Sequence, residues 1–296
     1  MKAWIQAFRL RTLPLAFSGW LIGFALVYRE SEVDPVIAVL TLLTAIFLQI
    51  LSNLANDYGD ATSGVDEHRI GEARMVSSGE ISASAMRKAM VVFALLSLIS
   101  GIGLLMIAFP EDWSSALVFF GLGVIGIIAA IKYTVGKNPY GYAGFGDLFV
   151  FIFFGFVLVF GTYFLQTQVF NWLIILPATS MGLFSVGVLN VNNIRDIESD
   201  KAAGKYSIPV RLGKQAAIRY HIVLLAAGLV CSLLFVILTY ESLLNYLFIP
   251  VVILLMKNIK AVRTLPADQL DPFLKQMAIS TLIFSLLFSL GQMLSM

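Results

Sequence analysis

Two clusters of carboxylate and amide side chains lie far apart in the sequence, and each closes an apolar stretch long enough to cross a membrane. The first cluster runs from Asn53 to Asp60, with Asp66 just beyond it, and the second runs from Asn190 to Asp200. Carboxylates are costly at a hydrocarbon boundary, so those that occur there usually serve a function. Mg²⁺ is bound by a few carboxylates together with substrate phosphates. The two clusters therefore predict a site that holds Mg²⁺ against a diphosphate.

Helical spacing places the members of each cluster on one face. Asn56 and Asp60 fall at positions i and i+4 if the helix continues through the first cluster. Asn192, Asp196 and Asp200 fall at i, i+4 and i+8 in the second. The alternative is that these residues only cap helix ends. Two such arrays on one side of a membrane favour a metal site, because oxygen-rich faces from two helices can line one cavity.

Basic side chains accompany both clusters. Arg74 follows the first, and Arg195 and Lys205 lie within and after the second. Positive side chains stabilise the charge that develops on a departing diphosphate. Most other basic residues are explained by membrane orientation and lipid headgroups. We therefore expect Arg74, Arg195 and Lys205 to contact the diphosphate.

A loop rich in glycine and tyrosine follows the fourth apolar stretch. It contains Tyr133-x-x-x-Lys137 and Tyr142, and Asp147 opens the next apolar stretch. Glycine and proline allow the tight turns that such a loop needs. The tyrosines could instead form an aromatic belt at the membrane interface. Asp147 could instead be a negative charge that the helix dipole favours at a helix N-terminus. The loop is nevertheless a candidate wall of a substrate site.

The composition is that of a membrane protein. Hydrophobic residues make up 59% and charged residues 13% of the 296-residue chain, and the mean hydropathy is +0.88, whereas a soluble domain carries about 25% charge. A spanning helix needs about 20 apolar residues. The sequence predicts an all-α polytopic protein, a bundle of nine transmembrane helices in a single domain, residues 1–296. The nine stretches are residues 12–29, 35–55, 86–108, 114–132, 146–165, 171–191, 218–238, 243–262 and 276–296.

The loops between these stretches alternate in charge. Of the 20 Lys and Arg residues, only Arg29 falls on one side, and all the others fall on the opposite side. The positive-inside rule makes the basic side cytoplasmic, with the N-terminus inside, the C-terminus outside and both acidic clusters facing the cytoplasm. The small net charge of +2 gives no reason to expect a nucleic-acid partner.

Taken together, these features resemble the UbiA superfamily of intramembrane prenyltransferases. The resemblance is carried by the nine spans and by Asn56-Asp57-x-x-Asp60, Tyr133-x-x-x-Lys137 and Asp196-x-x-x-Asp200. The two clusters and the Asn138–Asp147 loop are most similar to the branch that uses 1,4-dihydroxy-2-naphthoate. One position departs from the superfamily pattern, because Gly64 stands where a third acid is usual and the acid comes at Asp66.

The resemblance implies a set of roles for particular residues. The implied Mg²⁺ ligands are Asn56, Asp60, Asp196 and Asp200. The implied catalytic carboxylates are Asp57, Asp60, Asp66, Asp196 and Asp200. The implied diphosphate contacts are Arg74, Lys137, Asn193, Arg195 and Lys205, and the implied acceptor contacts are Tyr133, Tyr142 and Asp147.

The resemblance also implies a reaction. A polyprenyl diphosphate would donate its prenyl group to 1,4-dihydroxy-2-naphthoate with loss of CO₂, in menaquinone synthesis at the bacterial cytoplasmic (inner) membrane. Another UbiA acceptor, 4-hydroxybenzoate or homogentisate, is an alternative. A membrane transporter is a further alternative, since intramembrane acids also mark ion paths. Membrane lipid is the expected surrounding in every case.

The charge pattern yields a test of topology. A cysteine introduced by Arg69→Cys should react with a membrane-impermeant thiol reagent only from the cytoplasm, because basic loops stay inside. One introduced by Glu111→Cys should react only from the other side. Both are measured on intact cells and inverted vesicles, with the single native cysteine, Cys231, replaced by serine. Labelling of both positions from the same side contradicts the nine-span topology.

Overall fold

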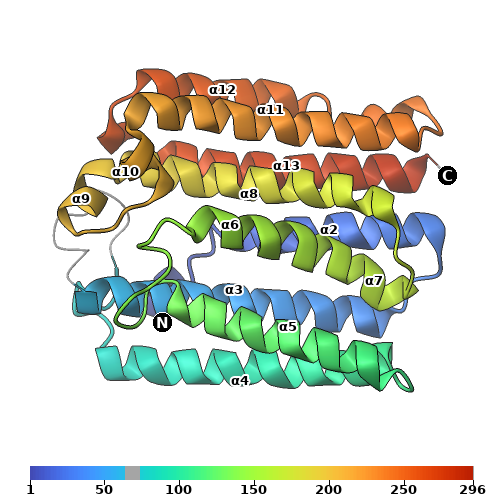
Figure 1. The fold of residues 1–296 in the computed structure, drawn as a ribbon, viewed down its shortest axis with the longest axis horizontal. Coiled ribbons are helices and arrows are strands. Elements are labelled where there is room, and N and C mark those ends of the chain that lie inside the picture. The colour runs from blue at the N-terminus through green and yellow to red at the C-terminus, as the bar shows by residue number, and fades with distance from the viewer. Residues whose placement is uncertain (64–73, 296) are drawn as a thin grey trace.

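The computed structural model describes residues 1–63 and 74–295, and this part of the chain is helical, without a strand. Most helices run along the long axis of the molecule, as Figure 1 shows. The longer elements are α2 (Leu13–Glu30), α3 (Pro35–Ser63), α4 (Ala83–Ala108), α5 (Trp113–Lys132), α8 (Ile175–Arg195), α11 (Lys214–Leu238), α12 (Val251–Thr264) and α13 (Asp271–Leu294). The shorter ones are α1 (Lys2–Ala7), α6 (Gly146–Val150), η2 (Phe151–Phe160), α7 (Gly161–Thr167), η3 (Trp172–Ile174), α9 (Ile197–Ala202), α10 (Ile208–Leu212), η4 (Leu243–Tyr246) and η5 (Ala267–Gln269).

All nine predicted apolar stretches are largely helical within the described residues. Within the described ranges, eight helical segments are long and apolar enough to cross a membrane. The first predicted stretch is the 18-residue helix α2, which is a ninth helix beside these eight segments and is not counted among them. It ends in the polar pair Arg29-Glu30. Helices α4 and α5 turn most of their surface outward, since only 22% and 11% of an apolar 18-residue stretch of each helix is buried. Such apolar outer faces are suited to lipid.

Two spans differ from a simple helix. The fifth consists of α6, the π-helix η2 and α7 in succession. The eighth begins with the 3₁₀ turn η4 and becomes α-helical only after Pro250. The π-helical segment η2 is rich in phenylalanine. Segments of π-helix are often found near functional sites.

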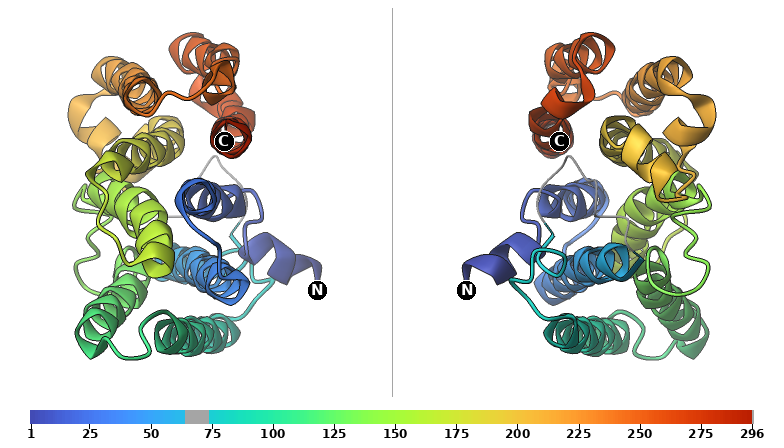
Figure 2. Two further views of the ribbon diagram at one scale, coloured as in Figure 1. Left: turned by 90° about the vertical axis from the view of Figure 1, so that its right-hand side faces the viewer. Right: turned by 90° about the vertical axis from the view of Figure 1, so that its left-hand side faces the viewer.

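The helices pack so that the ninth span returns to the first. α3 packs along α4, α8 packs along both α11 and η2, and α13 packs along α2. The end-on views of Figure 2 show these neighbours around the bundle. The largest apolar core joins α2, η2, α8, α11, α12 and α13.

The fold brings the two acidic clusters to the same end of the bundle. α3 continues beyond the predicted span to Ser63, so the first cluster is helical throughout. α8 ends at Arg195, and the second cluster continues through Asp196 into α9. The helix is therefore interrupted at Asp196, although the Asp200 amide still donates to the Asp196 carbonyl oxygen at 2.8 Å.

Candidate active site between the two acidic clusters

The first cluster is held against the tyrosine loop by a close helix–loop contact. A Cβ atom at Gly59 would lie 2.5 Å from Thr134 Oγ1, so only glycine permits this approach. The Thr134 hydroxyl donates to the Ala55 carbonyl oxygen at 2.9 Å and lies 3.3 Å from Asn56 Oδ1. The contact orients Asn56 at the end of α3.

Asp57 points away from Asn56 and caps a turn. Its Oδ2 accepts from the Met75 amide and its Oδ1 from the Val76 amide, each at 2.9 Å. Both oxygens of this buried carboxylate are thus used by the backbone that immediately follows Arg74. The contacts favour a positioning role for Asp57, and the catalytic role that the sequence predicts for it stays a prediction.

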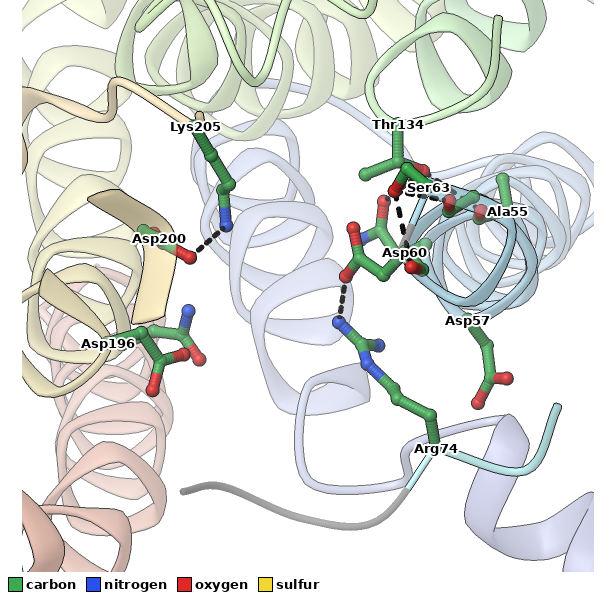
Figure 3. Close-up of polar contacts among 12 residues, drawn as sticks. Ala55, Asp57, Asp60, Ser63, Arg74, Thr134, Asp196, Asp200 and Lys205 are labelled. Carbon is green, nitrogen blue, oxygen red and sulfur yellow. Dashed lines mark hydrogen bonds and ion pairs between the residues drawn. The ribbon is translucent and has the colours of Figure 1, made fainter. Parts of the chain in front are cut away.

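Asp60 faces the opposite way and binds a cation. The guanidinium of Arg74 donates to Asp60 Oδ2 at 2.5 Å, and both side chains are buried. The Tyr142 hydroxyl donates to Asp60 Oδ1 at 2.8 Å. Figure 3 shows the Asp60–Arg74 pair. Tyr142, predicted to contact an acceptor, therefore lies with the first acidic cluster instead.

The second cluster begins with a network around Arg195. The Arg195 guanidinium, only 1% exposed, donates to both carboxylate oxygens of Asp196 at 2.8 Å. It also donates to Asn192 Oδ1 at 2.9 Å and to Asp271 on α13. Asp271 in turn accepts from Arg11 at 3.2 Å. Arg195 therefore links α8 to α13, and these contacts favour a structural role over the predicted contact with diphosphate.

Asp200 carries the second cation pair. The Lys205 ammonium donates to Asp200 Oδ1 at 3.2 Å, and the Lys205 amide donates to the Asp200 carbonyl oxygen at 2.8 Å. Asn193 lies on α8 nearby in sequence, and its buried Oδ1 has no hydrogen-bond partner among the described residues.

A cavity of about 370 Å³ connects the two clusters. Its polar end is lined by Asn56, Asp60 and Arg74 from the first cluster and by Asn192 and Lys205 from the second. Figure 3 places Asp60 and Arg74 on one side, with Asp196, Asp200 and Lys205 on the other. The predicted convergence of the two clusters on one cavity is therefore present in the structure.

The tyrosine loop covers one wall of this end. Tyr133 lines the cavity, and burial, followed by the nearby carboxylate of Asp147, raises the pKa of its phenol, so that it stays protonated. Tyr140 packs edge-on against Tyr133 at 5.4 Å, and its hydroxyl donates to the Ala129 carbonyl oxygen. Tyr133 therefore places a protonated phenol beside the cavity.

Eight residues predicted for the site are not among the described residues that line the cavity. Six of them, whose contacts are given above, are Asp57, Tyr142, Asn193, Arg195, Asp196 and Asp200, and the other two are Lys137 and Asp147. Lys137 is exposed and is not among the described residues that line the cavity. Asp147 is buried and accepts from the Tyr220 hydroxyl at 2.9 Å, also away from the lining. Asp66 lies outside the described residues. The predicted roles of Lys137, Asp147 and Asp66 remain predictions.

Sequence reasoning overlooked the turn before the first span. Arg9 and Arg11 line the cavity, although a topological role seemed sufficient for both. Arg9 has the left-handed backbone φ of 49°, which costs energy for a residue other than glycine and often marks functional sites. Asn53 holds the turn, since its amide donates to the Phe8 carbonyl oxygen and to Thr12 Oγ1, both at 2.9 Å. The basic pair of Arg9 and Arg11, just before Thr12, is the signal in the sequence that could have indicated this part of the cavity wall.

The donor set is suited to Mg²⁺. Asn56, Asp60, Asp196 and Asp200 supply carboxylate and amide oxygens, the ligands that Mg²⁺ prefers, and Asn193 adds an unsatisfied buried oxygen. No three acidic, His or Cys side chains gather into one cluster within residues 1–63 and 74–295. The acids are paired with cations instead, so these residues fit an ion that also takes oxygen ligands from a substrate.

The bundle and its paired clusters define an integral membrane protein with a substrate cavity at one end of its spans. The chain belongs to the UbiA prenyltransferase family, whose sequence profile matches residues 16–285. It is 43% identical over 296 residues to the 1,4-dihydroxy-2-naphthoate octaprenyltransferase of Escherichia coli (strain K12), covering 99% of this chain and 96% of that one. The enzyme of the same name from Haemophilus influenzae is 44% identical, with 98% and 96% covered.

A solved structure has the same fold. It is a UbiA homolog from Archaeoglobus fulgidus bound to GPP and Mg²⁺, with a TM-score of 0.60 and 18% sequence identity. The match covers 95% of this chain and 99% of that one.

The two hydrogen bonds of Asp57 yield a prediction. Asp57→Ala leaves two buried amides without a partner, which should destabilise the protein by about 2–4 kcal/mol. It should also release Arg74, and therefore raise the KM for the diphosphate substrate more than it lowers kcat. Thermal unfolding in detergent and steady-state kinetics measure the two effects.

Asp57→Asn provides the contrast, because its amide oxygen keeps one of the two bonds. A positioning role predicts intermediate stability and an intermediate KM. Loss of kcat in Asp57→Asn with unchanged stability would instead establish a direct catalytic role.

Proposed function

We propose that this protein transfers the polyprenyl group of a polyprenyl diphosphate to 1,4-dihydroxy-2-naphthoate, with loss of CO₂, in menaquinone synthesis. The observation that carries the proposal is the identity of 43% and 44%, over nearly the whole chain, with two enzymes named for that reaction. The cavity supports it independently, because it joins a polar, cation-rich end to long apolar walls. A substrate with an anionic headgroup and an apolar tail needs both.

The donor diphosphate lies between the two clusters in this proposal. Arg74 and Lys205 line the cavity from opposite clusters, and each is already paired with a carboxylate. An entering diphosphate gains two cations from opposite walls, and Arg9 adds a third at the mouth. Asn56, Asp60, Asp196 and Asp200 would hold Mg²⁺, which would supply positive charge to neutralise the anionic leaving group.

The reaction begins with cleavage of the allylic C–O bond. Diphosphate departs with the electron pair, and Arg74 and Lys205 stabilise its developing charge. A carbon of the electron-rich naphthoate ring attacks the allylic carbon and forms the new C–C bond, and the acceptor carboxylate leaves as CO₂. The apolar walls exclude water, which would otherwise capture the allylic cation.

The acceptor is placed by the tyrosine loop. Tyr133 lines the cavity and its phenol is protonated, so in this proposal its hydroxyl donates a hydrogen bond to an oxygen of the acceptor. Tyr142 and Asp147 act indirectly, Tyr142 by orienting Asp60 and Asp147 by binding Tyr220. The protein acts as one membrane domain in the bacterial cytoplasmic membrane, with the cavity mouth facing the cytoplasm, where basic loops gather.

The first test concerns the metal. Turnover should require Mg²⁺ or Mn²⁺ and should stop in excess EDTA. Asp60→Ala and Asp196→Ala should each lower kcat/KM by at least about 100-fold, because each removes an oxygen ligand and a carboxylate partner of a buried cation. Release of diphosphate from a labelled donor is the measurement.

Glu198→Ala is the matched control. Glu198 lies between Asp196 and Asp200 but is exposed, so its replacement should leave turnover unchanged. Full activity of the wild-type protein in EDTA would refute the metal mechanism.

The second test concerns the acceptor. Purified protein in lipid should prenylate 1,4-dihydroxy-2-naphthoate, release CO₂, and prefer this acceptor to 4-hydroxybenzoate. The second ring adds about four carbons of apolar contact, worth on the order of 100-fold in kcat/KM. Tyr133→Phe should raise the KM for the acceptor, while Tyr206→Phe, at an exposed position, should not.

Equal turnover of both acceptors, or a product from 4-hydroxybenzoate alone, would move the chain to another branch of the family. Transport of a prenyl diphosphate without any prenylated product would contradict an enzyme altogether.

A further inference from the structure

The cavity extends far beyond its polar end. On α3 its lining runs from Asp60 to Thr41, a helical distance of about 28 Å at 1.5 Å per residue. This length is close to the ~30 Å thickness of a bilayer core. Other helices that line it are α2, α4, α5, the η2–α7 segment, α8 and α13. Of these, α4, α5 and the η2–α7 segment lie on one side of the bundle in the end-on views (Figure 2). The apolar part is therefore a tunnel along the bundle axis.

Aromatic rings close the far end of this tunnel. Phe119 stacks on Phe164 with ring centroids 5.6 Å apart and planes at 10°, and Phe109 packs on Phe119 at 5.5 Å. Phe119 and Leu165 themselves line the cavity. A linear apolar chain that enters at the polar end therefore has a defined depth available to it.

Two glycines keep the far part of the tunnel open. Gly123 of α5 lines the cavity, and a Cβ atom there would meet nothing within 4 Å. Gly101 of α4 also lines it, and its Cβ atom would meet only Thr44 Cγ2, at 3.9 Å. Any side chain at these two positions would project into open tunnel space. Glycine is thus what leaves room in the far part of the tunnel.

The same helices provide matched positions outside the tunnel. Gly103 of α4 and Gly121 of α5 also have nothing within 4 Å of an added Cβ atom. They are each two residues from the tunnel glycines, and neither is among the described residues that line the cavity. Two residues correspond to about 200° around a helix, so these positions face a different direction.

We propose that Gly101 and Gly123 determine the length of the prenyl chain that this protein accepts. The inference rests on the proposed function, because it takes the tail of a polyprenyl diphosphate as the occupant. A polyprenyl diphosphate suits this space because the tunnel is continuous with the cation-lined end, where its diphosphate would bind, and because the tunnel walls are apolar like its tail. A side chain at either glycine narrows the far part of the tunnel and leaves room only for shorter chains.

Direct binding tests this proposal without an acceptor. Unreactive thiolodiphosphate analogues with geranyl, farnesyl, geranylgeranyl and octaprenyl chains are titrated against the protein in lipid nanodiscs with Mg²⁺. Gly101→Leu and Gly123→Leu should keep their affinity for the geranyl analogue and lose at least about tenfold in affinity for the two longest analogues. Gly103→Leu and Gly121→Leu should bind all four analogues as the wild-type protein does.

Retained binding of the geranyl analogue also shows that each variant is folded. Equal loss at every chain length, no loss at any length, or the same loss in the two control variants overturns the proposal. If the wild-type protein binds none of the analogues, the proposed function fails as well. If the wild-type protein binds the analogues, but phospholipid competes equally against all four, the tunnel holds lipid. In that case this proposal fails and the proposed function stands.

Discussion

Neutralisation of charge at the membrane boundary is the constraint on which the site depends. A carboxylate or guanidinium buried beside hydrocarbon is stable only when it is paired and hydrogen-bonded. Asp60, Asp196 and Asp200 meet this requirement through Arg74, Arg195 and Lys205. Removing one member of such a pair costs about 3–5 kcal/mol, because the other charge stays buried. The cluster geometry is therefore fixed by electrostatics before any substrate enters.

The same constraint gives the charged groups two different tasks. Arg74 and Lys205 are paired and also line the cavity, so a more strongly charged ligand can recruit them. Arg195 is enclosed by Asp196, Asn192 and Asp271 and ties α8 to α13. One set can act on substrate, and the other maintains the walls between which it acts.

The spans could be predicted from the sequence because apolar runs of membrane length have few alternatives to helix. The two acidic clusters and their convergence were also predictable, since both follow spans on the basic side. The direction of individual side chains was not. Asp57 and Asp60 look equivalent in the sequence, yet one caps the turn after Arg74 and the other faces the cavity.

Long-range partners were equally hidden from the sequence. Asp271 looks like an ordinary first residue of a helix, but it joins Arg11 and Arg195 from two distant segments. The π-helical segment in the fifth span has no marker in hydropathy, which is uniformly high there. Such features depend on which helices become neighbours, and hydropathy does not encode that pairing.

The position of Asp271 has a consequence for biosynthesis. Membrane helices are delivered to the bilayer in chain order, at about 5–20 residues per second. Arg11 and Arg195 enter early, and their shared carboxylate on α13 arrives only after some 260 and 76 further positions, respectively. Until then Arg195 has Asp196 and Asn192 as partners but lacks Asp271, Arg11 lacks the same carboxylate, and α2 has no α13 packed along it. The polar end of the bundle is thus completed only when α13 docks along α2 and brings Asp271 to Arg11 and Arg195.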